Sequence, residues 1–307
     1  MLDDESLGIV EEDCTGCGLC VRACPTAAIE LPLGQVRLAG READRVAYAA
    51  CAHCTGQAGQ ARVTCVNAIG LVDLVAMHNR GVRELRIRDG CEFSVGRSSG
   101  PPLDLAIERF ARLAASRGLP GIRLQRLAAP IWDAAEQAAG SRQPHTRSPS
   151  RRALLSALIP SATAAVADRL NLDELTGGSL SGRDRDGALY PHVPDIDPAL
   201  CSGCDACIQI CPTAALTLVN PSPEQTAYRI DQAPCTGCML CVDVCDQHAV
   251  SVTAMMPAGR SEIPLYSARC RACGVQFHHP PSRESESVLC RICRATNRAA
   301  QLFQVLE

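Results

Sequence analysis

Aromatic side chains are scarce in this chain of 307 residues, which has one tryptophan, four tyrosines and four phenylalanines. Groups other than large side chains must therefore fill much of its interior. The two signs of charge nearly balance, at a net −3 and a pI near 6.2, which gives no electrostatic reason to expect a nucleic-acid partner. No apolar run reaches the roughly 18 residues of a membrane span. The nearest run, residues 153–167, is broken by Pro160.

Export signals and nucleotide motifs are also missing. The N-terminal stretch MLDDESLGIVEED is acidic and has no apolar segment of the kind found in signal peptides. No glycine-rich phosphate loop, hydrolytic triad or flavin motif is visible. We therefore expect a cytoplasmic location, or one at the cytoplasmic face of a membrane complex. In that reducing compartment the 20 cysteines would bind metals rather than form disulfides.

Three copies of one cysteine pattern, C-x2-C-x2-C-x3-C, dominate the sequence. Each copy has an isoleucine five residues before its first cysteine and a glycine two residues after it. This spacing lets three thiolates wrap one face of an iron-sulfur cubane, with the glycine allowing the backbone to curl close. Loop A holds Cys14, Cys17, Cys20 and Cys24; loop B holds Cys201, Cys204, Cys207 and Cys211; loop C holds Cys235, Cys238, Cys241 and Cys245.

Loops B and C lie 23 residues apart, and residues 193–254 resemble the bacterial two-cluster [4Fe-4S] ferredoxins. The resemblance implies a crossed ligand set, in which the fourth cysteine of each loop binds the other loop's cluster. One cluster would take Cys201, Cys204, Cys207 and Cys245, and the other would take Cys235, Cys238, Cys241 and Cys211.

A strand and helix alternation follows loop A. Periodicity predicts strands over 45–50, 61–64, 82–88 and 122–127, with helices over 70–80 and 103–117. Strands alternating with helices favour a small parallel sheet. Four cysteines fall at the carboxyl ends of the first three strands, the edge where open α/β sheets bind ligands. We call these the rim cysteines: Cys51, Cys54, Cys65 and Cys91.

Residues 45–137, with the segments VAYAACAHC, VTCVNAI and RGVRELRIRDGC, look like the small iron-sulfur subunit of methyl-viologen-reducing hydrogenases. The resemblance implies a [2Fe-2S] cluster and a link to a hydrogenase, a formate dehydrogenase or a heterodisulfide reductase. The chain departs from that pattern, because no second cysteine follows Cys91 closely and the segment between Cys54 and Cys65 is compressed. The rim cysteines could hold [2Fe-2S] or a fourth [4Fe-4S]. Alternatively, Cys65 and Cys91 are buried small hydrophobic residues.

The destination of Cys24 is open. It completes the cluster of its own loop, which we favour, or it crosses to join three rim cysteines while Cys65 joins loop A. Eight cysteines make two sites under either wiring.

Two further cysteine pairs lie near the C-terminus, CRAC and CRIC, separated by 16 residues. Such pairs resemble a zinc ribbon, a structural site closed by four thiolates. A rubredoxin-like iron site is the rival, but only the first pair is followed by glycine. We call the four residues the ribbon cysteines: Cys270, Cys273, Cys290 and Cys293.

The expected architecture is multidomain α/β and α+β, with a small parallel α/β sheet domain, a ferredoxin-like 2[4Fe-4S] domain and a zinc ribbon. Residues 140–152 read as a polar linker, followed by a docking or core helix whose apolar stripe spans 154–159. The predicted segments are 1–40, a ferredoxin-type loop; 41–140, the α/β iron-sulfur domain; 141–190, linker and docking helix; 191–258, the two-cluster ferredoxin domain; and 259–307, the zinc ribbon.

The 20 cysteines divide into five groups of four with none left over. That count predicts three [4Fe-4S] clusters, a rim cluster of either type and one zinc ion. We expect an electron-transfer subunit without a catalytic site of its own, relaying electrons between a flavin, molybdenum or nickel enzyme subunit and a redox partner. A ferredoxin-type maturation factor for a molybdoenzyme and a redox-sensing interaction protein are the alternatives.

Overall fold

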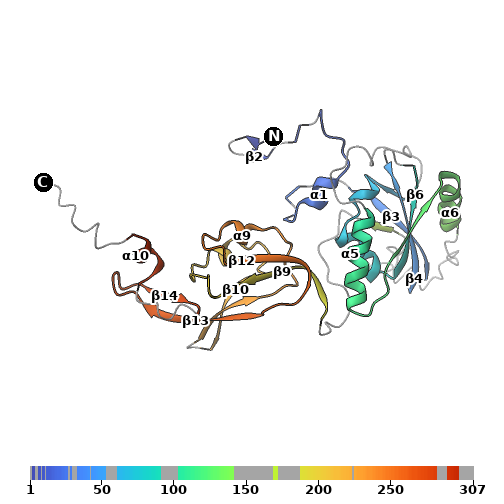
Figure 1. The fold of residues 1–307 in the computed structure, drawn as a ribbon. Helices are drawn as coiled ribbons and strands as arrows, with labels where there is room; N and C mark the ends of the chain where they lie inside the picture. The colour runs from blue at the N-terminus through green and yellow to red at the C-terminus, as the bar shows by residue number, and fades with distance from the viewer. Residues whose placement is uncertain are drawn as a thin grey trace, which may run out of the picture. The chain divides into compact units, whose positions relative to one another are not determined.

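The computed structural model divides the chain into two compact units, Met1–Arg183 and Asp184–Glu307. Each unit is described by itself below (Figure 1). The residues that the structure describes are 2–3, 6–7, 9–10, 12–26, 28–29, 33–41, 43–52, 61–90, 103–141, 169–171, 187–222, 225–281 and 289–296.

The first unit is a mixed α/β structure built on one main sheet, with a short helix from loop A beside it. Its elements in chain order are β1 (Leu2–Asp3), β2 (Ser6–Leu7), α1 (Leu19–Ala23), β3 (Gln35–Arg41), β4 (Asp44–Cys51), β5 (Arg62–Val63), η1 (Val66–Ala68), α3 (Leu71–Asn79), β6 (Val82–Arg88), α5 (Leu103–Ser116), β7 (Arg123–Leu127), α6 (Ala129–Ser141) and β8 (Arg169–Asn171).

The parallel part of this sheet follows the sequence prediction closely. Strands β4, β6 and β7 are hydrogen-bonded neighbours in parallel register, and β5 pairs in parallel with the end of β4. Alternate residues of β4 face opposite sides. Ala47 and Ala49 pack in the core cluster that also contains Leu74 of α3 and Phe110 of α5. The intervening Tyr48 packs instead against Trp132 of α6, so helices cover both faces of the sheet (Figure 1).

Two antiparallel strands of the main sheet and the helix after its strand β7 were not predicted. Strand β3 pairs antiparallel with β4, and β8 pairs antiparallel with β3, so the sheet has the order β7-β6-β4-β3-β8. Helix α6 follows β7 directly and buries Trp132, whose indole contacts Tyr48 edge to face at 6.5 Å between ring centroids. The sheet is therefore mixed rather than purely parallel, because β3 adds its backbone hydrogen bonds to the free edge of β4.

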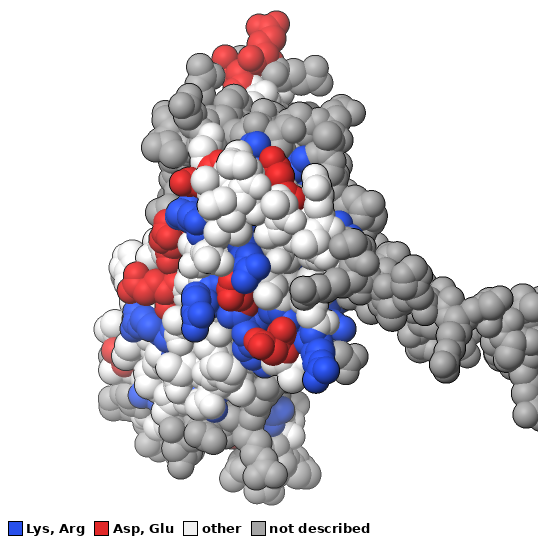
Figure 2. Space-filling model, turned by 90° about the vertical axis from the view of Figure 1, so that its right-hand side faces the viewer, with Lys and Arg blue, Asp and Glu red and all other residues white. Residues whose placement is uncertain are grey.

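Charged groups on this unit are interspersed rather than segregated. Figure 2 shows cationic and acidic side chains alternating over one face, and every cation is an arginine because the chain has no lysine. Ion pairs in this unit include Arg88 with Asp133 and Arg126 with Asp104.

In its described part, the second unit has a two-stranded sheet, a four-stranded sheet and three short helices. Its elements are β9 (Leu189–Ile196), α8 (Ala206–Ile210), β10 (Leu216–Ser222), β11 (Gln225–Ile230), α9 (Leu240–Asp243), β12 (Val250–Pro257), β13 (Glu262–Arg269), β14 (Gln276–His279) and α10 (Arg291–Thr296). Strands β9 and β12 pair antiparallel, and the other four form a sheet in the order β10-β11-β13-β14. Strands β10 and β12 follow the fourth cysteines of loops B and C, Cys211 and Cys245.

Strand β13 belongs to both halves of this unit. Its first residues pair with β11, as in Ile263 opposite Tyr228, and its last residues pair with β14, as in Ser267 opposite His278. The segment with the ribbon cysteines is therefore joined to the ferredoxin-like part by a continuous sheet.

Among the described residues, no helix has the length and apolar character to cross a membrane. The predicted docking helix at 154–159 lies outside the described residues, as does the predicted linker from residue 142 onward.

Candidate metal centres

The first candidate centre, which we call site I, combines cysteines from two loops. A cavity of about 490 Å³ is lined by Cys201, Cys204 and Cys207 of loop B together with Cys245 of loop C. Loop B can turn tightly here because Gly203 has a φ of +71°, in the left-handed region that glycine adopts without strain. Asp205 also has positive φ, at 64°, just before α8 begins. The arrangement is the crossed one that the ferredoxin resemblance implies.

The second centre, site II, is built from the same repeated loops as site I, with the roles of loops B and C exchanged. A smaller cavity is lined by Cys235, Cys238 and Cys241 of loop C together with Cys211 of loop B. Its other walls are mostly apolar, including Leu216 and Val252. The fourth cysteine of each loop therefore lies with the other loop in both cavities.

Neither set of thiols can ionise fully without a cation. Burial and then the neighbouring cysteines, including Cys245, raise the pKa of Cys207 to about 12. Burial and the cysteines of site II, including Cys211, raise the pKa of Cys241 to about 11. Because iron ions supply the positive charge that stabilises clustered thiolates, both donor sets fit an iron-sulfur cluster.

An orphaned hydroxyl in site II supports the same fit. Thr236 lines the cavity, and its buried Oγ1 has no hydrogen-bond partner among the described residues. Buried hydroxyls are normally satisfied, and the sulfur atoms of a cluster would accept this hydrogen bond.

Loop A reproduces the local turn of loop B around its fourth cysteine. The Cys24 sulfur lies 3.5 Å from Thr26 Oγ1 and accepts a hydrogen bond from the Ala28 N–H at 3.2 Å. Cys211 lies 3.9 Å from Thr213 Oγ1 in the same C-P-T turn. The hydroxyl of Thr26, followed by backbone N–H groups, lowers the pKa of Cys24 despite the opposing effect of burial.

Comparison with known protein families adds an independent result. Residues 200–249 match the 4Fe-4S dicluster domain. Residues 7–30, which include all of loop A, match the 4Fe-4S binding domain. No curated protein matches the chain. The two matched domains indicate iron-sulfur electron transfer. They do not include residues 45–137, so the resemblance of that segment to the hydrogenase subunit stays a prediction.

The ribbon cysteines, which follow the dicluster domain, are packed far more tightly than the loop cysteines. Their four sulfur atoms all lie within 4.8 Å of one another, and among the described residues this is the one group so close. Cys273 and Cys290 have their sulfurs 3.8 Å apart. A tetrahedral site with metal–sulfur bonds of about 2.3 Å places its sulfurs about 3.8 Å apart. The geometry therefore fits one metal ion, whereas a cubane separates its thiolates more because each binds a different iron.

Backbone donors support thiolates in the ribbon. The Cys290 N–H donates to the Cys270 sulfur at 3.3 Å and lowers the pKa of that thiol. The Cys293 N–H donates to the Cys290 sulfur at 3.5 Å. Such N–H···S contacts stabilise metal-bound thiolates.

The predicted rim site is described only in part. Cys51, at the end of β4, and Cys65, after β5, are both almost fully buried in the main core cluster of the first unit. The Cys51 thiol donates a hydrogen bond to the Thr64 carbonyl at 3.3 Å. Cys54 and Cys91 lie outside the described residues. A cluster ligated by the rim cysteines stays a prediction, and so does the alternative in which Cys65 and Cys91 are core residues.

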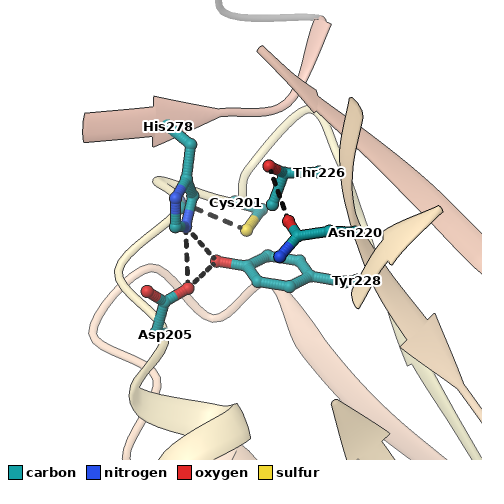
Figure 3. A network of polar contacts seen from close by, with 7 residues as sticks. Cys201, Asp205, Asn220, Thr226, Tyr228 and His278 are labelled. Carbon is teal, nitrogen blue, oxygen red and sulfur yellow. Dashed lines mark hydrogen bonds and ion pairs between the residues drawn. The ribbon is translucent and has the colours of Figure 1, made fainter. Parts of the chain in front are cut away.

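A polar network beside the dicluster domain's site I was not predicted from sequence. Asp205, which lies between two cysteines of loop B, accepts hydrogen bonds from Tyr228 of β11 and His278 of β14 (Figure 3). No short motif could have revealed it, because His278 is 73 residues from Asp205 and sits in the predicted ribbon.

The corresponding glycines of loops A and B offer a matched test of packing. A Cβ on Gly203 would lie 2.3 Å from the His278 carbonyl oxygen, whereas among the described residues nothing lies within 4 Å of a Cβ on Gly16. Both have positive φ, so Gly→Ala carries a similar backbone penalty of about 1–2 kcal/mol at each position. We expect Gly203→Ala to speed hydrogen exchange of β14 in the full chain, and Gly16→Ala to leave exchange of the segment around η1 near wild type. If the two variants changed local hydrogen exchange equally, the close approach of the His278 carbonyl to Gly203 would be contradicted.

Proposed function

We propose that this chain is an iron-sulfur electron-transfer subunit that relays electrons through several clusters between enzyme partners. The observation that carries the proposal is the crossed lining of sites I and II. Each loop contributes to both cavities, so two clusters would be held side by side in one dicluster domain. Adjacent clusters without a substrate-binding motif suit a relay rather than a catalyst.

The chain's own residues would bind, shield and tune the clusters. A bound [4Fe-4S] cluster supplies a one-electron redox centre. Site I would be held by Cys201, Cys204, Cys207 and Cys245, and site II by Cys235, Cys238, Cys241 and Cys211. Apolar walls such as Leu216 and Val252 would exclude water from site II, and the Thr236 hydroxyl would donate to sulfur there.

Loop A would hold a third [4Fe-4S] cluster. Cys24 lies in a C-P-T turn like the turn that contains Cys211. Cys211 belongs to loop B but lines the cavity of loop C. This likeness supports the crossed alternative, in which Cys24 joins rim cysteines and Cys65 joins loop A. The rim would then hold the fourth cluster, [2Fe-2S] or [4Fe-4S].

The ribbon would bind one zinc ion with a structural role. Four thiolates fill a tetrahedral site and leave no position for a substrate. Such a site would stabilise a segment whose core consists of three buried cysteines with Phe277 and Leu289.

The partners we propose are other subunits of a cytoplasmic oxidoreductase complex, of flavoprotein, hydrogenase or formate dehydrogenase type. Anaerobic purification of the full chain from its native cells tests this. Stable co-purification with a flavin-, nickel- or molybdenum-containing subunit supports the relay. Binding only to a cofactor-free apo-enzyme would instead support a maturation role.

Metal content provides the direct test of the cofactors. We expect the anaerobically prepared, fully loaded chain to contain about 14 iron ions with a [2Fe-2S] rim cluster, or about 16 with [4Fe-4S], plus about one zinc. Iron, sulfide and zinc analysis with EPR of the reduced protein measures this. An iron content of about 12 ions or fewer in the fully loaded chain would contradict a rim cluster. Absence of EPR signals from sites I and II in the reduced protein would contradict the relay itself.

A further inference from the structure

Elements flanked by or containing the ribbon cysteines lie against site I and loop B. Strand β14 lies between the two cysteine pairs, and α10 contains Cys293. Arg291 and Ile292 of α10 form part of the wall of the site I cavity. The described lining of site II includes no ribbon residue. The two cluster sites thus differ in which part of the chain surrounds them.

The backbone of β14 lies directly against loop B. The Cβ position at Gly203 is 2.3 Å from the His278 carbonyl oxygen and 3.1 Å from the His279 Cα, so only glycine permits this approach. The equivalent Gly237 of loop C faces the His192 ring of β9 instead. The ribbon strand is therefore a wall of loop B, whereas the glycine of loop C lies against β9, outside the ribbon.

The side chain of His278 extends this contact to a carboxylate beside the cysteines. Its Nε2 donates to Asp205 Oδ1 at 2.8 Å, and the Tyr228 hydroxyl donates to the same oxygen at 2.6 Å. The His278 and Tyr228 rings meet edge to face, and Figure 3 places the Cys201 sulfur beside His278.

We propose that the ribbon metal site positions His278 on Asp205, and that His278 acts through this carboxylate to set the potential of the cluster in site I but not in site II. The proposal rests on the proposed function, because it requires a cluster in each site. His278 is a positioning residue, since its N–H donor stabilises the negative charge of Asp205 beside the cysteines of site I.

The direction of the effect follows from electrostatics. Reduction adds an electron to the cluster, so an uncompensated carboxylate nearby disfavours the reduced state and lowers the potential. Removing the His278 donor leaves Asp205 with Tyr228 as its remaining described donor. The equilibrium for one electron between the two sites should then shift several-fold away from site I.

The decisive comparison is between neighbouring histidines on β14. His278→Phe keeps an aromatic ring but removes the donor to Asp205. His279→Phe makes the same change one residue later, where the ring packs against Tyr266 and Phe277 and its Nδ1 donates to the Pro280 carbonyl. Anaerobic redox titration of the full chain, followed by EPR, gives the potentials. Cys245→Ser and Cys211→Ser identify the signals of sites I and II.

We expect His278→Phe to lower the potential of site I and to leave site II unchanged, while His279→Phe changes neither. Tyr228→Phe, which removes the other donor without touching the ribbon, should also lower the potential of site I. Asp205→Asn should raise that potential, and adding His278→Phe to it should have little further effect.

Equal shifts in both sites, equal effects of the two histidine variants, or a His278→Phe shift that persists in Asp205→Asn would overturn the proposal. A wild-type chain that binds no iron in site I would refute the proposed function instead. The two failures are distinguishable by metal analysis of the wild type.

Discussion

Removing Cys201 and Cys245 together should release no more iron than removing either one alone. Both residues line site I, so the double variant Cys201→Ala/Cys245→Ala should lose about four iron ions, the content of one cluster. In contrast, Cys201→Ala/Cys211→Ala should lose about eight, because Cys211 lines site II. Iron and sulfide analysis of the anaerobically reconstituted full chain measures these losses.

The two double variants serve as controls for each other, since each removes two thiols, one pair spanning loops B and C and the other lying within loop B. Single variants at the three positions supply the baseline. If the loops bound their clusters without crossing, the pair Cys201 and Cys211 would share one cluster and the pattern would reverse. EPR of the remaining clusters separates the loss of one site from collapse of the dicluster domain.

Replacing Arg22 with methionine should strongly destabilise the first unit near neutral pH. Arg22, on α1 of loop A, forms an ion pair with Asp73 of α3, whose side chain is fully buried. Asp73 also accepts a hydrogen bond from the Gly70 N–H at 2.7 Å. Loss of Arg22 leaves a buried carboxylate without its cation, which costs about 3 kcal/mol or more.

The size of this penalty should fall in mild acid. Burial raises the pKa of Asp73 from 3.8 to about 6, although Arg22 opposes the shift. Because the folded pKa lies above the unfolded one, stability is lost as the pH rises through about 6 and the buried group ionises. Without Arg22 that pKa should rise further, so Arg22→Met should be most destabilising near pH 7.5 and much less so near about pH 5.5.

Trp132 can report the unfolding of the first unit, since it is the single tryptophan of the chain and is buried in that unit. Its fluorescence during urea unfolding at the two pH values reports the stability of this unit. Arg126→Met is the matched control, because Arg126 pairs with Asp104 on the surface and its loss should cost less than about 1 kcal/mol at either pH. A penalty for Arg22→Met that is equally small, or independent of pH, would contradict the buried ion pair.

Much of the first unit's secondary structure could be predicted because its apolar pattern is local. The predicted strands 45–50 and 82–88 correspond to β4 and β6, and the helix predicted over 103–117 corresponds to α5. Strand β3 was missed because the alternation of Val36 and Leu38 with polar residues is short, and the strand is completed by its pairing with β4. Helix α6 was missed as well, although its alanine-rich sequence suits a helix.

Cysteine spacing also has a limit as a predictor. It identified loops A, B and C and the ribbon cysteines, because ligand spacing within one turn is a local property. It could not show that β13 joins the ribbon to the dicluster domain, or that His278 reaches Asp205. Both depend on strand pairing between segments distant in sequence.

The sequence by itself determined which thiols form each ligand loop and where the glycines let those loops turn. The tertiary structure decided which cavity each fourth cysteine of the dicluster domain lines, since Cys245 lies in the cavity of loop B and Cys211 in that of loop C. It also decided that the ribbon forms a wall of site I and not of site II within the described residues. The physical reason is that spacing fixes geometry only within a turn, whereas the packing of β14 on loop B depends on sheet register and on the missing side chain of Gly203.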